Sequence, residues 1–187
     1  MGNTEYANKE DLAVGLEIVK KSPKDRGEIK LIVRRPDIDE REILHQAILD
    51  PEEGLVGDNW KSRSPNGKPH PERQLTLMNS RVISLLVSEK EDWALAGDQL
   101  YVDMDLSESN LPPGTQLNVG TAIIEITSLP HTGCKKFAER FGVDSLKFVN
   151  APTNKEFRLR GVNAKVVQAG ETRNGDIVKK RNKGGVI

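Results

Sequence analysis

The sequence predicts a mainly β protein, a β-barrel with a few short α-helices. Strand-like segments outnumber helical ones, most connections carry turn residues, and the strand spacing does not fit alternating β–α–β units. These segments partly alternate apolar and polar residues or are rich in β-branched residues, as strands are. They span residues 14–20, 28–34, 43–49, 73–78, 121–127, 162–168 and 176–179.

Turn residues predict how the first and last of these strands pair. The polar stretch 21–27 separates strands 14–20 and 28–34, which predicts an N-terminal hairpin. Residues 170–175, which begin and end with glycine, predict the turn of a closing hairpin in which 176–179 pairs back. The barrel would then begin and end with a local pair of strands.

Two helices are expected between the strands. Asn79 or Ser80 can cap the first, because an apolar helical pattern from Val82 to Trp93 follows it. The second begins at Cys134 and ends at the glycine that follows Phe141. Phe137 lies four residues before Phe141, so both side chains share one helical face.

Length and composition predict one domain over residues 1–187, with a core at about 28–180 and loose tails at 1–12 and 181–187. The 28 basic residues balance 28 acidic ones, and aromatic residues make up only 4%, so nucleic acid is not an expected partner. No segment is apolar enough to suggest a membrane span. A single cysteine fits a reducing compartment, and the expected location is cytoplasmic.

Cys134 is the first candidate catalytic residue. It lies at an expected helix start, and Lys135 and Lys136 follow it, a setting that favours the nucleophilic and metal-binding thiolate. The alternative is a small buried residue that packs beside Phe137. His131, three residues earlier, can assist the thiol or simply bond to the loop backbone. It cannot complete a structural zinc site with one cysteine.

Residues 53–72 are loop-like, and loops of this length in a domain are usually functional or disordered. The part 53–63 is the second candidate site: its glycines allow the backbone to approach a ligand, and Asp58, Asn59, Lys61 and Arg63 can hold a phosphorylated molecule. An ordinary surface loop and a solvated strand end are the alternatives. The candidate cofactor-binding residues are Gly57, Asp58, Asn59, Lys61, Arg73, Thr132 and Lys135.

Other polar residues give weaker patterns. Asp98, Asp103 and Asp105 alternate and can bind a hard cation, but their spacing is not that of an EF-hand, and a polar edge strand explains them better. His45 and His70 show no metal-ligand spacing.

An ordered set of short motifs runs through most of the chain. The set comprises residues 33–36 (VRRP), 55–58 (LVGD), 73–77 (RQLTL), 111–117 (LPPGTQL), 125–127 (EIT), 134–136 (CKK) and 161–167 (GVNAKVV), followed by Gly170 and Gly175-Asp176. Together the motifs resemble the MOSC domain, the C-terminal module of molybdenum cofactor sulfurases. The resemblance covers about residues 28–180, and Cys134 falls where this family has its signature cysteine.

The resemblance implies a β-barrel and a role in molybdenum cofactor (molybdopterin) binding or sulfur transfer. Cys134 would either carry sulfur as a persulfide or ligate molybdenum, since a thiolate is both a good nucleophile and a soft ligand. Arg73, Asp58 and Lys61 would then hold the pterin and its phosphate. The chain has no room for the pyridoxal-phosphate desulfurase domain of the sulfurases. A cysteine desulfurase or other sulfur donor, and in a redox role a separate reductase, are therefore the implied partners.

The chain departs from the family pattern at two places. His131-Thr132-Gly133 stands where the family usually has Arg-x-Pro before the cysteine, and Asp98-Gln99-Leu100 stands where many members have Glu-Asn-Leu. These changes leave a second hypothesis open: a non-catalytic module that binds a small ligand or metal, in which Cys134 is structural.

Overall fold

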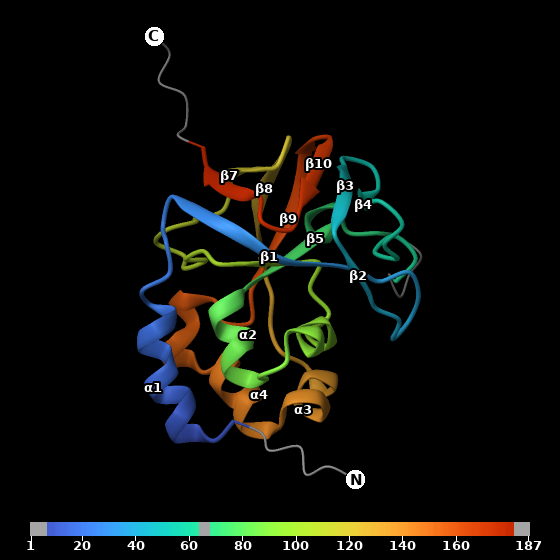
Figure 1. Cartoon of the computed structure of the whole chain (residues 1–187). Helices are drawn as coiled ribbons and strands as arrows, with labels where there is room; N and C mark the ends of the chain where they lie inside the picture. The colour runs from blue at the N-terminus through green and yellow to red at the C-terminus, as the bar shows by residue number, and fades with distance from the viewer. Residues whose placement is uncertain (1–6, 64–67, 182–187) are drawn as a thin grey trace.

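The predicted β-barrel is confirmed in the computed structural model, which describes residues 7–63 and 68–181. The barrel strands are hydrogen-bonded in the order β1, β11, β7, β8, β9, β5 and β6, and β6 pairs with β1 to close the ring (Figure 1). All neighbours are antiparallel except β5 and β6. The strands are β1 (Arg26–Arg34), β5 (Leu75–Asn79), β6 (Leu100–Val102), β7 (Gln116–Val119), β8 (Ala122–Pro130), β9 (Val162–Gln168) and β11 (Ile177–Lys180).

Smaller elements surround the barrel. Strand β2 (Glu42–Leu44) extends β1, while β3 (Gln46–Asp50), β4 (Gly54–Leu55) and β10 (Gly170–Arg173) form a separate sheet. The α-helices gather on one side of the barrel (Figure 1): α1 (Lys9–Val19), α2 (Ser80–Leu86), α3 (Lys135–Phe141) and α4 (Val143–Asn150). Short 3₁₀ helices are η1 (Pro71–Arg73), η2 (Lys90–Ala96) and η3 (Pro152–Phe157). Among residues 7–63 and 68–181, no helix has the length and apolarity that crossing a membrane requires.

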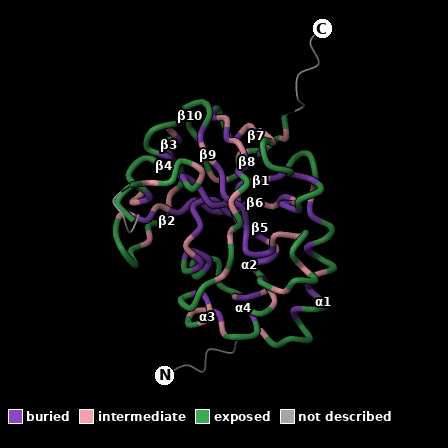
Figure 2. The backbone as a smooth tube through the Cα atoms, turned by 180° about the vertical axis from the view of Figure 1, so that it is seen from behind, coloured by how far each residue is buried: buried purple, intermediate pink, exposed green. Residues whose placement is uncertain are grey.

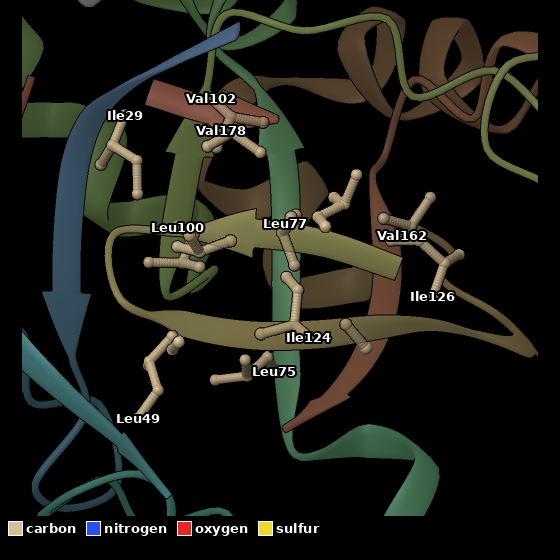
Figure 3. Packing of buried hydrophobic residues seen from close by; sticks show 14 of the residues in the cluster. Ile29, Leu49, Leu75, Leu77, Leu100, Val102, Ile124, Ile126, Val162 and Val178 are labelled. Carbon is tan, nitrogen blue, oxygen red and sulfur yellow. The ribbon is translucent and has the colours of Figure 1, made fainter. Parts of the chain in front are cut away.

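Alternation along the strands fills the barrel. Leu75 and Leu77 of β5 point inward and meet Leu100 of β6 and Ile124 of β8 (Figure 3). Successive strand side chains face opposite sides, so every second residue joins this core. The inward residues are fully or nearly fully buried, which makes the barrel a packed core with no channel.

A second core lies between the barrel wall and the helices. Met78 and Tyr101 face outward from β5 and β6, and both are fully buried. They pack with helix residues such as Leu12 of α1 and Phe141 of α3. Burial therefore follows the strands through the middle of the molecule, while outward-facing parts of the helices stay exposed (Figure 2).

The predicted N-terminal hairpin is wrong, because its first half is helix α1. The Asn8 side chain caps this helix by accepting hydrogen bonds from two backbone N–H groups in the first turn. Leu12 and Val19 lie two helical turns apart and are buried, whereas the β-branched Val14 and Ile18 are exposed. The helix also takes in residues 9–12, which were expected to be a loose tail.

The predicted C-terminal hairpin is also wrong. Residues 170–173 form strand β10 and pair with β3, not with a turn partner nearby. Strand β11 pairs instead with β7 and β1, which places Val178 opposite Val119 and Gly27. This non-local pairing closes the barrel, and a local turn pattern could not indicate it. In the predicted C-terminal tail, residues 182–187 lie outside the described part of the chain.

Candidate functional site

The floor of the candidate site is the outer wall of the barrel. Thr76 of β5 lies opposite Asn163 of β9, and the neighbours of both residues point into the barrel core. Both polar side chains therefore face outward, where they are nearly buried at the base of a cleft. The Asn163 side-chain amide donates to the carbonyls of Leu129 and Pro130, which fixes the chain just before His131.

The cleft has a volume of about 660 Å³ and is unusually rich in arginine. Its walls come from the segment after β1, the segment after β4, η1, the end of η2, the segment after β8, and helix α3. The cationic lining residues are Arg35, Arg41, Arg63, Arg73, Lys136, Arg140 and Arg160. Asp37 and Asp39 are the carboxylates that line it among the described residues.

Five of the predicted site residues converge on this cleft. They are Asn59, Arg73, His131, Thr132 and Cys134. Residues separated by up to 75 positions in the sequence thus meet in one place.

Four other predicted residues do not line the cleft: Gly57, Asp58, Lys61 and Lys135. Lys61 pairs with Glu53 at 2.8 Å on an exposed surface. The Lys135 side chain is 92% exposed and lies 3.8 Å from Glu139. Both lysines are therefore solvated surface groups in this structure.

Cys134 is the N-cap residue of α3, with extended backbone (φ −119°) and an exposed thiol-bearing side chain. It is therefore not the small buried residue that packs beside Phe137. Phe137 and Phe141 instead pack against each other on the buried face of α3, with tilted rings whose centroids are 4.7 Å apart. Within the described residues no hydrogen bond joins His131 to Cys134.

The loop before Cys134 is fixed by α4. The Asn150 side chain accepts from the Gly133 N–H at 2.9 Å and donates to the Gly133 carbonyl at 3.0 Å. A Cβ atom at position 133 would lie 2.7 Å from a methyl carbon of Leu146. The absence of a side chain lets this loop pack closely on α4, which sets the position of the cysteine.

Asp58 holds Arg35 in place beneath the cleft. Its two carboxylate oxygens accept from the Arg35 guanidinium at 2.7 and 2.8 Å, and one also accepts from the Arg35 backbone N–H. The Asp58 side chain is fully buried. Such a forked pair fixes the arginine's orientation, so Asp58 acts on the cleft through Arg35.

Asp98 organises the other side of the cleft. Its fully buried carboxylate accepts from Arg160 at 2.6 Å and lies 2.9 Å from Nε2 of His131. Burial raises the pKa of Asp98, but the charge of Arg160 and the hydrogen bond from His131 outweigh it and lower the pKa to about 2. The carboxylate is therefore ionised, so His131 donates from Nε2 and its Nδ1 is the nitrogen left to accept.

His131 itself is held neutral. Burial and then the charge of Arg160 lower the pKa of His131, and these effects exceed the opposing effect of Asp98. The cleft therefore contains a neutral imidazole of fixed tautomer beside several guanidinium groups.

The two shifts predict that the fold loses stability in acid in two stages. Because the pKa of His131 is lower in the folded protein than its ordinary 6.5, the unfolded chain takes up this proton first, and stability falls as pH drops below about 6.5. Asp98 stabilises above its ordinary pKa of 3.8, and about 2 kcal/mol is lost as pH falls towards 2. Urea unfolding between pH 8 and pH 2 measures both stages.

His131→Gln provides the control for this pH profile. The variant is expected to lose the change that begins near pH 6.5 and to keep the change at lower pH, because only the Asp98 contribution remains. Identical profiles for the wild type and His131→Gln between pH 7 and pH 5 would contradict the prediction.

Sequence reasoning missed most of the cleft's charge. Arg41, Arg140 and Arg160 come from three separate segments, and no local pattern joins them, whereas Arg63 belongs to the loop that was expected to hold a phosphorylated molecule. Sequence reasoning also missed His70, which lines the cleft and accepts from the Glu72 N–H through Nδ1. Composition gives no signal for these residues, because the chain contains 12 arginines against 16 lysines and its charge is balanced.

The aspartates proposed for a hard cation do not come together. Asp98 pairs with Arg160, while Asp103 pairs with Arg81 at 2.7 Å elsewhere on the barrel. In the described ranges, no group of three or more His, Cys, Asp or Glu residues is arranged to hold a metal ion.

Comparisons with known proteins identify the fold. No family model matches the sequence, and no curated protein matches it. Among solved structures, the YuaD protein from Bacillus subtilis has a TM-score of 0.60 at 13% identity and covers 85% of this chain and 97% of its own. YiiM from Escherichia coli has a TM-score of 0.53 at 20% identity and covers 86% and 72%. YiiM from Geobacillus stearothermophilus has a TM-score of 0.55 at 16% identity and covers 84% and 76%. At these identities the likeness establishes a shared fold.

Proposed function

We propose that the chain is a MOSC-domain protein that uses Cys134 in sulfur transfer or in binding a molybdenum cofactor. The carrying observation is that the exposed Cys134 lines the same arginine-rich cleft as Arg73, His131 and Asn59. The ordered motifs of the sequence support the family, as does the fold shared with YuaD and YiiM, which are MOSC-domain proteins.

The residues of the cleft fit a molybdopterin-type cofactor. Such a group combines a soft metal with an anionic phosphate, and the cleft combines one thiol with several guanidinium groups. The buried Oδ1 of Asn59 has no hydrogen-bond partner among the described residues and lies in a lining residue, so a ligand donor can satisfy it. Cys134 would hold the metal, while Arg73 and Asn59 would orient the rest of the group. When bound, the group would supply oxygen-atom and electron transfer.

The sulfur-transfer form of the proposal needs only the thiol and a donor. The Cys134 thiolate attacks the terminal sulfur of a donor persulfide, the donor's S–S bond breaks, and the donor leaves as a thiolate. Cys134 then carries the persulfide. Its exposed place at the start of α3 allows a separate protein to reach it.

Cys134→Ser tests this form directly. After incubation with a cysteine desulfurase and cysteine, the wild type is expected to gain the mass of one sulfur atom, and the variant is expected to gain none. Intact-mass spectrometry measures the adduct, and a reducing agent should remove it. An unmodified wild-type protein, or equal adducts on both proteins, would refute sulfur loading at this residue.

Metal analysis tests the cofactor form. Protein produced in a host that makes the cofactor is expected to contain molybdenum in proportion to protein, and Cys134→Ser is expected to lose it. Molybdenum retained in Cys134→Ser would show that Cys134 is not needed to hold the metal.

A binding module without thiol chemistry is the second candidate. The observation that favours it is the charge of the cleft, since an array of guanidinium groups can hold an anion without help from a cysteine. A wild-type protein that shows no sulfur loading, together with a Cys134→Ser variant that keeps ligand affinity, would support this alternative.

A further inference from the structure

One end of the cleft concentrates positive charge that the protein does not neutralise. Arg35 is paired with Asp58, and Arg160 is paired with Asp98. Among the described residues, no ion pair within 4.0 Å involves Arg41, Arg63 or Arg73. These three arginines therefore line the cleft without a carboxylate in direct contact.

The surroundings of Arg41 destabilise the positive charge of its guanidinium group. Burial, then the charges of Arg140 and Arg35, lower the pKa of Arg41. Its Nε atom is buried and has no hydrogen-bond partner among the described residues, and one Nη donates only to the neighbouring Glu40 carbonyl. Because an arginine does not release its proton in a protein, this charge stays unfavourable unless an anion binds beside it.

Arg63 faces the same group of charges from the segment after β4. Arg63 is exposed, yet the surrounding protein and then the charge of Arg35 lower its pKa, against the opposing charges of Asp58 and Asp39. The charge of Arg41 also lowers this pKa. Both guanidinium groups line the same cleft.

Asp39 forms ion pairs with two of the cations that line the cleft. It accepts from Lys136 at 2.9 and 3.0 Å and from Arg140 at 3.0 Å, both on α3. Its backbone is in the left-handed region (φ 60°), which is unusual for a residue other than glycine. The side chain is 54% exposed, so a ligand can compete with it.

We infer that Arg41, Arg63 and Arg140 form a binding subsite for a tetrahedral dianion of the phosphate class, and that Asp39 is an internal competitor for it. Two guanidinium groups that line one cleft and form no ion pair of their own match a doubly charged oxyanion better than a single carboxylate. The inference deepens the proposed function because it names the ligand class of the same cleft. It does not require the Cys134 thiol.

Isothermal titration with inorganic phosphate at constant ionic strength tests the subsite. Arg41→Gln is expected to weaken binding about tenfold, because it removes charge-assisted hydrogen bonds. Arg63→Gln is expected to weaken it less, because this side chain is more exposed. Asp39→Asn is expected to strengthen binding several-fold, because asparagine tolerates the left-handed backbone but no longer competes for Arg140.

Arg173→Gln is the matched control. It removes the same charge from β10, where Arg173 lies 3.6 Å from Glu171 and does not line the cleft, and phosphate affinity is expected to stay within about twofold of the wild type. Sulfate is expected to compete with phosphate, and formate is not. Equal weakening in Arg173→Gln and Arg41→Gln would overturn the subsite, as would the absence of saturable binding to the wild type at millimolar phosphate.

Two further arms identify the source of the phosphate group and separate this inference from the proposed function. Tighter binding of phenyl phosphate than of inorganic phosphate would indicate a phosphate ester whose organic part lies along the cleft, and equal affinity would indicate a free oxyanion. Cys134→Ser is expected to bind phosphate as the wild type does. Phosphate binding that persists when sulfur loading and molybdenum binding both fail would refute the proposed function and leave the subsite standing.

Discussion

Asp98→Ala is expected to lower the free energy of unfolding by about 3–5 kcal/mol, the cost typical of breaking a buried ion pair from one side. The Asp98 side chain is fully buried and holds the guanidinium of Arg160, whose side chain is 8% exposed. Without the carboxylate, Arg160 keeps a buried charge with no counter-ion, and His131 loses its hydrogen bond to Asp98. Urea denaturation measures the loss.

Asp103→Ala provides the comparison. Asp103 also pairs with an arginine, accepting two hydrogen bonds from Arg81, but both side chains are about a quarter exposed, so the expected loss is about 1 kcal/mol or less. The double replacement Asp98→Leu with Arg160→Met is expected to recover part of the stability, because it removes both buried charges. Equal losses of unfolding free energy in Asp98→Ala and Asp103→Ala would show that burial does not make the Asp98 pair more important for stability than the Asp103 pair.

Gly161→Ala is expected to cost about 3 kcal/mol or more. The residue has φ +114°, and a Cβ atom there would lie 2.2 Å from the backbone carbonyl oxygen of Leu77. That oxygen belongs to β5, a strand buried between two barrel neighbours, so it cannot move aside as a side chain would. Backbone strain and overpacking therefore add together.

Gly175→Ala separates the two contributions. Gly175 also has positive φ (+90°), but a Cβ atom there would have no neighbour within 4 Å, so only the backbone strain of about 1 kcal/mol is expected. Gly161 also adjoins the cleft, because its Cβ position lies 3.3 Å from the His131 ring. His131 ring resonances are therefore expected to shift in Gly161→Ala and to stay in place in Gly175→Ala. Equal stability of the two variants would contradict the steric argument.

Local patterns predicted those elements whose stabilising contacts are close in sequence. The strand expected at 162–168 is β9, and the helix expected from Cys134 to Phe141 is α3 with its glycine end. The helix expected from Asn79 begins as predicted, with Asn79 as its cap, but α2 ends at Leu86, and Trp93 lies in the separate 3₁₀ helix η2. The parts that were predicted correctly have their apolar pattern within one segment, so the sequence contains the signal for them.

Prediction failed where packing between distant segments decides the structure. The β-branched residues of α1 favour a strand in isolation, but the Asn8 cap and the buried stripe of Leu12 and Val19 favour a helix packed on α2. Gly15 shows how close that packing is, since a Cβ atom there would lie 2.5 Å from Leu85. Tertiary burial outweighs a weak local preference.

The sequence by itself determined the fold class, the strand-rich core and the importance of the segment around Cys134, because alternation, turns and a lone flanked thiol are local features. Tertiary structure alone decided which charges share the cleft and which of them are neutralised. Asp58 and Lys61 are neighbours in sequence, yet one is buried against Arg35 and the other is a surface residue. The ionic environment of a site depends on distance and burial in space, and barrel closure through non-local strand pairing sets both.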